Sequence, residues 1–125
     1  MADFDFVILY VASPAASAEF YAGLLGKPIV QQSPGFAVLP LRDGVMLGLW
    51  AKDNVEPKVA ASAGAGSGEI GFNVDSDDAV AATFKAWKKR GLAITQEPTK
   101  MNFGFTFTAL DPDGHRLRVY SPSAR

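Results

Sequence analysis

Cysteine is absent from the 125 residues of this chain. Disulfides, thiolate metal sites and cysteine nucleophiles are therefore excluded. A long hydrophobic run is also absent. The apolar stretch at the start, MADFDFVILYV, carries two acids, lacks a basic flank and is too short for a signal peptide or a membrane span. We therefore expect a cytoplasmic protein with no membrane partner.

An excess of positive charge is missing as well. The net charge is −1, and basic residues follow one another only at Lys88, Lys89 and Arg90, where a helix is expected to end. Basic residues there complement the helix dipole, whereas a nucleic-acid partner requires a clustered basic surface. We expect no nucleic-acid partner. The length and a hydrophobic content of 48% instead indicate a single folded domain.

The most informative stretch occurs twice. Residues 36–50, FAVLPLRDGVMLGLW, and residues 106–120, TFTALDPDGHRLRVY, both place an Asp-Gly pair between alternating segments, seventy positions apart. An Asp-Gly pair accepts the positive φ of a tight turn, so each copy predicts a β-hairpin. In the first outgoing strand, Met46, Gly48 and Trp50 share one face. Gly48 beside a Trp predicts a shelf with open space above it.

Hydrophobic periodicity and capping residues predict the remaining elements. Ser13 and Ser76 are placed to cap two helices that end at Gly26 and Gly91. In the second helix, Trp87 belongs to an apolar stripe and is expected in the core. Strands are expected at 3–12, 27–32, 69–74 and 92–97, with a loop at 98–101.

The two halves of the sequence repeat one βαβββ plan. Val11 and Ser13 match Val74 and Ser76 at an offset of sixty-three. Such a repeat predicts an α+β fold in which each half buries its helix against one sheet face. We expect a single domain made of a module at about 1–52, a flexible connector rich in Ala, Gly and Ser at 53–68, and a module at about 69–125.

Several of these motifs together resemble one superfamily. VASPAASAEFYAGLLG, followed by the Asp-Gly hairpin, the capped second helix and DPDGHRLRVY, is similar to the vicinal oxygen chelate superfamily. That superfamily includes glyoxalase I, extradiol dioxygenases, and the fosfomycin and bleomycin resistance proteins. The resemblance covers nearly the whole chain. It implies paired βαβββ modules that form a half-open, barrel-like cleft, usually in a homodimer that exchanges modules.

The metal ligands of that superfamily are replaced in this chain. Matched by motif, the three ligand positions fall on Phe6, Glu69 and Arg118. Phe has no lone pair and Arg stays protonated, so one oxygen ligand remains where a divalent ion needs three protein ligands. We expect no metal and no other cofactor. We also expect Glu69 and Arg118 to form an ion pair in the space of the ion.

Without the metal, the resemblance implies a cleft that is lined largely by aromatic side chains. The hairpin alignment and the strand alternation predict that it is lined by Phe6, Tyr10, Phe36, Val38, Met46, Gly48, Trp50, Glu69, Phe103, Thr108, Arg118 and Tyr120. Planar ligands stack on such surfaces. Within the superfamily, the hairpin ending in MLGLW is most similar to the antibiotic-binding branch, especially proteins that sequester phenazines without altering them. Bleomycin-binding relatives are strongly acidic, so a net charge of −1 favours a neutral or weakly anionic planar ligand.

Alternative interpretations stay open for some of these residues and for the function. Trp50 can also be a core residue or cover a dimer seam, and Phe103 can serve packing alone. His115 follows a tight turn but lacks a neighbouring nucleophile, so a role in the turn is favoured over general base catalysis. The expected function is non-catalytic sequestration of a flat aromatic antibiotic or metabolite, giving drug resistance. The alternatives are a metal-dependent or acid–base lyase or dioxygenase, and an accessory subunit that binds a protein partner.

Overall fold

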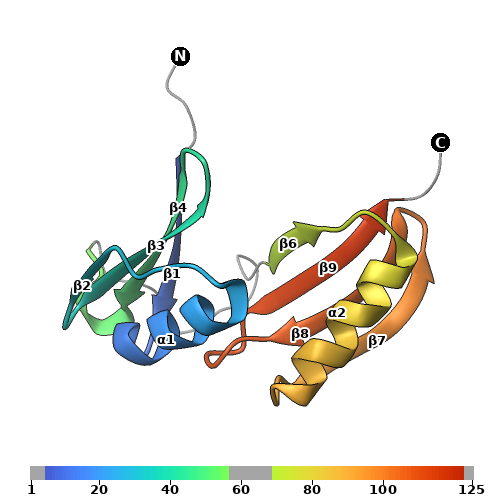
Figure 1. Ribbon diagram of the computed structural model, residues 1–125. Helices are drawn as coiled ribbons and strands as arrows, with labels where there is room; N and C mark the ends of the chain where they lie inside the picture. Colours follow the sequence, from blue (N-terminus) through green and yellow to red (C-terminus); the bar gives the residue numbers. More distant parts are fainter. Residues whose placement is uncertain (1–4, 57–68, 123–125) are drawn as a thin grey trace. The chain divides into compact units, whose positions relative to one another are not determined.

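A computed structural model describes residues 5–56 and 69–122 of the chain (Figure 1). The chain divides into two compact units, residues 1–62 and residues 63–125. Each unit follows the predicted order of one strand, one helix and three strands. The α+β class and the paired βαβββ plan are therefore confirmed, whereas the cleft and the exchanged dimer stay predictions.

Unit 1 is built on a four-stranded sheet of order β1-β4-β3-β2, in which β1 runs parallel to β4 and the other neighbours are antiparallel. The predicted caps of its helix are confirmed, because Ser13 Oγ accepts a hydrogen bond from the backbone N–H of Ala16 at 3.2 Å and Gly26 ends the helix at φ 65°. The elements of unit 1 are β1 (Phe6–Val11), α1 (Pro14–Leu25), β2 (Gln31–Ser33), β3 (Phe36–Arg42), β4 (Val45–Ala51) and the short 3-10 helix η1 (Lys52–Asn54).

Unit 2 repeats this arrangement with a sheet of order β6-β9-β8-β7, in which β6 runs parallel to β9. Ser76 Oγ caps its helix by accepting a hydrogen bond from the backbone N–H of Ala79 at 3.1 Å. No helix in the described part of the chain is long and apolar enough to cross a membrane. The elements of unit 2 are β6 (Glu69–Asn73), α2 (Asp77–Lys89), β7 (Ile94–Met101), β8 (Gly104–Leu110) and β9 (Arg116–Pro122).

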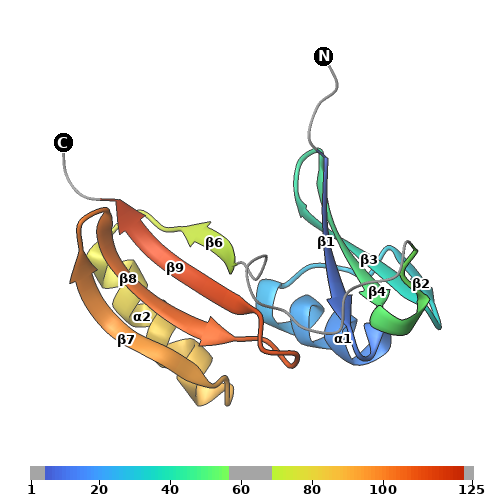
Figure 2. The same cartoon turned by 180° about the vertical axis from the view of Figure 1, so that it is seen from behind.

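In each unit the helix lies across one face of its own sheet (Figures 1 and 2). The strand alternation decides which side chains the helix covers. Trp87 is 7% exposed, and its ring packs edge-on against Phe72 and Phe107, so its predicted core position is confirmed. The completely buried leucines of the strands are Leu39, Leu47 and Leu49 in unit 1 and Leu117 in unit 2.

Both predicted hairpins are confirmed. Gly44 and Gly114 adopt φ values of 80° and 89° at the two turns, a region in which side chains other than glycine are disfavoured. The register pairs Phe36 with Trp50 in unit 1 and Thr106 with Tyr120 in unit 2. The seventy-residue repeat in the sequence is therefore a repeat of strand register.

Two strands differ from their predicted bounds by four residues at one end. The strand expected at 27–32 is only β2, because Pro28 lacks an N–H, although Val30 still donates a hydrogen bond to the carbonyl of Val38 at 2.8 Å. The loop expected at 98–101 is the end of β7, which pairs with β8 as far as Met101. Pro98 is tolerated there because β7 is an edge strand.

The predicted connector also begins with structure. η1 occupies its first residues, and Val55 is 3% exposed. The side chain of Asn54 lies against Gly35, where an added Cβ would come within 2.8 Å of its amide nitrogen. The first residues of the predicted connector therefore have a defined structure, and the flexibility of the connector stays a prediction. Residues 57–68 of the predicted connector lie outside the described residues.

Candidate functional site

The face of the unit 1 sheet opposite α1 is rich in aromatic side chains. β1 contributes Phe6, Ile8 and Tyr10, which are 38%, 43% and 43% exposed. Trp50 and Phe36, both half-buried, come from the adjoining strands. Because Tyr10 pairs with Trp50 and Trp50 pairs with Phe36, the side chains lie on one continuous surface. These five residues are called the aromatic face.

Trp50 lies in the middle of the aromatic face. Its ring centroid is 6.4 Å from that of Tyr10 and 6.1 Å from that of Phe36, with interplanar angles of 79° and 90°. Edge-to-face pairs of this kind contribute about 0.5–1.5 kcal/mol each beyond the burial of area. The indole is therefore held by a neighbour from each adjacent strand while part of its surface stays exposed.

The space expected above Gly48 is occupied by side chains of the same unit. An added Cβ at this position would lie 3.0 Å from Phe6 Cε1, 3.0 Å from Phe36 Cζ and 3.4 Å from Ile8 Cγ1. The prediction of an open shelf is therefore wrong. Gly48 has a different consequence: because it has no side chain, rings from the two flanking strands converge over β4.

Two further predicted lining residues lie on the same side of the sheet. Met46 is half-buried and pairs with Phe6. Val38 pairs with Gly48 but is only 5% exposed, so it supports the aromatic face from below and adds almost no surface of its own.

Unit 2 carries a polar cluster in the equivalent position, on the sheet face opposite α2. The predicted ion pair between Glu69 and Arg118 is confirmed, since Nε of Arg118 donates to Oε2 of Glu69 and Nη2 lies 3.5 Å from Oε1. Arg118 Nη1 donates to Gln96 Oε1 and to Thr106 Oγ1, both at 3.2 Å. The guanidinium group is therefore fixed by contacts from three other strands. These four residues are called the polar cluster.

Gln96 and Thr106 are the members of this cluster that the predicted lining did not include, and Gln96 reaches it through a change in strand register. Strict alternation would place Gln96 on the same face as Ile94. In the structure Ile94 pairs with Ala109 and Gln96 pairs with Thr108, so a register shift between them turns Gln96 to the face of Arg118. No residue type in this stretch marks the bulge in advance.

The remaining predicted residues of unit 2 surround the polar cluster. Thr108 is 2% exposed and donates to Gln96 Oε1 at 3.3 Å, so it lies beneath the cluster rather than at its surface. Phe103 is 44% exposed; its ring lies 5.6 Å from the guanidinium carbon of Arg118 and 6.2 Å from the ring of Tyr120. Phe103 therefore contacts the cluster with a partly exposed ring, and its role in binding stays a prediction.

The residues at the superfamily's metal positions do not fit a divalent ion. Phe6 offers no donor atom, and the carboxylate of Glu69 is already bound by a guanidinium group that keeps its proton. Within residues 5–56 and 69–122, no three His, Asp or Glu side chains gather in a metal-binding group. A catalytic metal needs three protein ligands, so no step of metal chemistry can be assigned to these positions.

His115 belongs to the turn between β8 and β9. Its Nδ1 lies 2.8 Å from Oδ2 of Asp111, whose Oδ1 also accepts hydrogen bonds from the backbone N–H groups of His115 and Asp113. The hydrogen bond to Asp111 raises the pKa of His115 above its ordinary value of 6.5, against the opposing effect of partial burial. The buried carboxylate therefore organises the turn, in agreement with the predicted role of His115.

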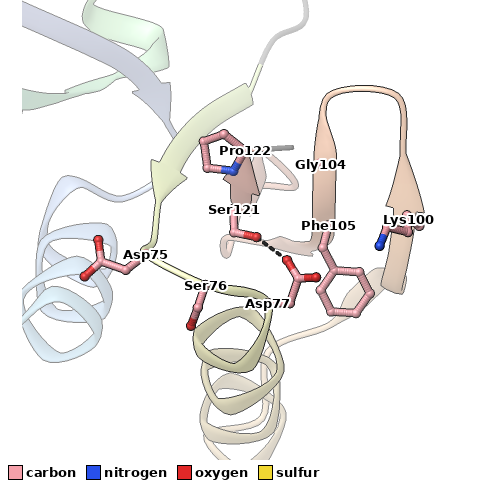
Figure 3. Close-up of a pocket in the computed structure, with 8 residues that line it drawn as sticks. All are labelled: Asp75, Ser76, Asp77, Lys100, Gly104, Phe105, Ser121 and Pro122. Carbon is pink, nitrogen blue, oxygen red and sulfur yellow. Dashed lines mark hydrogen bonds between the residues drawn. The ribbon is translucent and has the colours of Figure 1, made fainter. Parts of the chain in front are cut away.

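A separate hollow of about 310 Å³ lies at the start of α2. Figure 3 shows the Ser121 and Asp77 side chains pointing toward one another across it, and Ser121 Oγ donates to Asp77 Oδ1 at 2.5 Å. None of its residues belongs to the predicted lining. The hollow is lined by Asp75, Ser76, Asp77, Lys100, Gly104, Phe105, Ser121 and Pro122.

Known proteins resemble this chain over nearly its whole length. The phenazine antibiotic resistance protein EhpR of Enterobacter agglomerans is 28% identical over 115 residues, which cover 90% of this chain and 86% of that protein. A protein of Agrobacterium tumefaciens, solved by NMR in solution, is 51% identical, with a TM-score of 0.87 over 99% of this chain and 100% of that one.

A glyoxalase-related enzyme from Fulvimarina pelagi shares the fold at 22% identity, with a TM-score of 0.79 over 97% of this chain and 88% of that one. The model of the Glyoxalase/Bleomycin resistance protein/Dioxygenase superfamily matches residues 3–119, which is most of the sequence. The two βαβββ units agree with that match. The chain therefore belongs to the Glyoxalase/Bleomycin resistance protein/Dioxygenase superfamily.

Proposed function

We propose that this protein binds a flat aromatic antibiotic or metabolite of the phenazine type and sequesters it without altering it, which gives drug resistance. The observation that carries the proposal is the aromatic face, in which Trp50 is held by Tyr10 and Phe36 beside the exposed ring of Phe6. Fixed aromatic rings bind planar ligands at a low cost in conformational entropy.

The similarity to EhpR supports the choice of ligand class, because that relative is a phenazine antibiotic resistance protein. Membership of the superfamily supports binding of a small molecule, and the proposal includes a homodimer in the cytoplasm. The superfamily also contains enzymes, but the replaced metal positions and the engagement of His115 with Asp111 favour binding over catalysis.

Tryptophan fluorescence tests the proposal directly, because the chain has two tryptophans and only Trp50 lies on the aromatic face. Trp87→Phe leaves Trp50 as the sole indole. We expect saturable quenching of this variant by phenazine, phenazine-1-carboxamide or phenazine-1-carboxylate at micromolar or lower concentration.

The affinity is measured in parallel by calorimetry, because Trp50 is both the reporter and the proposed contact. We expect Trp50→Leu to weaken binding roughly tenfold, as the loss of one stacked ring implies, while Trp87→Phe keeps the affinity of the native chain. If none of the three compounds binds the native protein, the proposal is wrong, and the aromatic face becomes a candidate surface for a protein partner.

A further inference from the structure

We propose that the polar cluster of unit 2 selects planar ligands that carry an uncharged hydrogen-bond acceptor, such as a carbonyl or amide oxygen, over ligands that carry a carboxylate. This inference rests on the proposed function and names the ligand chemistry that the same protein accepts. The cluster consists of Glu69, Gln96, Thr106 and Arg118, as defined above.

The polar cluster contains one cation and one anion. Arg118 is the cation of the cluster, and Glu69 binds it through both carboxylate oxygens. The side chains are 19% and 36% exposed, so the pair is only partly screened by water. A ligand that approaches Arg118 therefore meets a neutral pair whose negative end is the more exposed one.

The guanidinium group of Arg118 has one more donor than its neighbours in the cluster accept. Arginine has five N–H donors. The single donor on Nε goes to Glu69, and the two on Nη1 go to Gln96 and Thr106. Nη2 makes one long contact of 3.5 Å with Glu69 Oε1, which leaves one of its N–H groups without an acceptor among the described residues. Arg118 therefore retains donor capacity at Nη2.

The acceptors around Arg118 are held in place by hydrogen bonds of their own. Thr106 Oγ1 donates its proton to the carbonyl of Val119 at 2.8 Å, so its lone pairs face Arg118. The Oε1 atom of Gln96 is fixed by the hydroxyl of Thr108, and its Nε2 lies 3.4 Å from the sulfur of Met101. The direction of the remaining Nη2 donor is therefore set before a ligand binds.

The carboxylate of Glu69 distinguishes charged from uncharged ligands. Nη2 already contacts Oε1 of Glu69, so a ligand carboxylate bound to Nη2 lies next to the carboxylate of Glu69, and the two like charges repel. A neutral oxygen accepts the same hydrogen bond without that repulsion. Phe103, 5.6 Å from the guanidinium carbon and 44% exposed, offers an aromatic surface beside the donor. The cluster therefore favours a planar, uncharged acceptor.

The test compares phenazine-1-carboxamide with phenazine-1-carboxylate by calorimetry at pH 8, where the acid is ionised. We expect the native protein to bind the carboxamide more tightly. Glu69→Gln removes the negative charge and leaves Arg118 as a cation, so we expect the affinity for the carboxylate to rise roughly fivefold relative to the carboxamide. Glu97→Gln is the matched control, because the side chain of Glu97 is exposed on β7 and has no hydrogen bond to another described residue; only its backbone oxygen accepts one, from Thr99. This variant should leave the ratio of the two affinities unchanged.

A salt series with the native protein gives a second measurement that does not depend on the folding of a variant. Repulsion between two carboxylates weakens as salt screens it, so binding of the carboxylate should improve relative to the carboxamide as sodium chloride is added. The inference would be overturned if the native protein preferred the carboxylate and salt reduced that preference. An unchanged ratio of the two affinities in Glu69→Gln would overturn it as well. Binding of none of the compounds would instead contradict the proposed function, and this inference with it.

Discussion

Gly104 brings the start of β8 so close to β9 that a side chain cannot be placed between them. An added Cβ would lie 1.9 Å from the carbonyl oxygen of Ser121, and the residue adopts φ 148°. We expect Gly104→Ala to lower the free energy of unfolding by roughly 3 kcal/mol or more, because backbone atoms must move. Gly26→Ala is the control: φ is 65° there, but nothing lies within 4 Å of an added Cβ, so about 1 kcal/mol is expected. Equal losses in urea unfolding would show that the close approach at Gly104 is not the cause.

The contribution of His115 to the stability of the protein depends on pH. The folded pKa of His115 is raised above 6.5 by Asp111, so the stabilising contribution of the protonated ring is fully present below the unfolded pKa and is lost as the pH rises through the folded pKa. We expect the stability difference between the native protein and His115→Gln to be larger at about pH 5.5 than at about pH 8.5.

The same interaction is observable without unfolding the protein. His115 is the only histidine, so its ring proton gives one assignable signal in an NMR titration. The midpoint should lie above 6.5 in the native protein and fall in Asp111→Asn, since the acceptor loses its charge. A midpoint at or below 6.5 in the native protein would contradict the ion pair.

Individual site residues were predictable where the type of a single residue determines what it can bind. The opposite charges of Glu69 and Arg118 predicted the ion pair that the structure shows, and Phe6 offers no donor atom at its superfamily ligand position. Gln96 was not predictable, because its orientation depends on a bulge. The occupation of the space over Gly48 was also not predictable from the sequence, because it depends on the rotamers of rings from two other strands.

At the scale of elements, two serine caps start the two helices in the same way. Ser13 and Ser76 each accept a hydrogen bond from the N–H three residues later, at 3.2 and 3.1 Å. We expect Ser13→Ala and Ser76→Ala each to lower the free energy of unfolding by about 1 kcal/mol. Ser33→Ala, at the exposed end of β2, where Ser33 Oγ donates to the carbonyl of Phe36, should cost less than about 0.5 kcal/mol. Chemical denaturation of the three variants measures these values, and a loss in Ser33→Ala as large as in the other two would argue against capping.

Elements with local signals were predicted well, and elements set by distant contacts were not. The Asp-Gly turns and the serine caps depend on a few neighbouring residues, so both hairpins and both helices were found. The bounds of β2 and β7 depend on which residues pair with β3 and β8, and no local residue type marks those limits.

At the scale of the whole molecule, the internal repeat gives the chain two sheet faces of different character, each opposite the helix of its own unit. Unit 1 presents the aromatic face, and unit 2 presents the polar cluster with Phe103 and Tyr120 beside it. The βαβββ repeat was evident in the sequence because equivalent residues recur at nearly constant offsets. The proposed homodimer predicts a mass in solution of twice 13.3 kDa by light scattering, whereas a mass of 13.3 kDa would contradict it.

Sequestration without chemistry is the central claim, and recovery of the ligand tests it most directly. Native protein is incubated with an excess of phenazine-1-carboxamide, with and without added divalent metal ions, and both the bound and the free ligand are then extracted and analysed by mass spectrometry. We predict saturable binding with complete recovery of the unchanged compound, and no effect of the metal ions. Conversion of more ligand than there is protein, in either condition, would contradict sequestration and identify the chain as an enzyme.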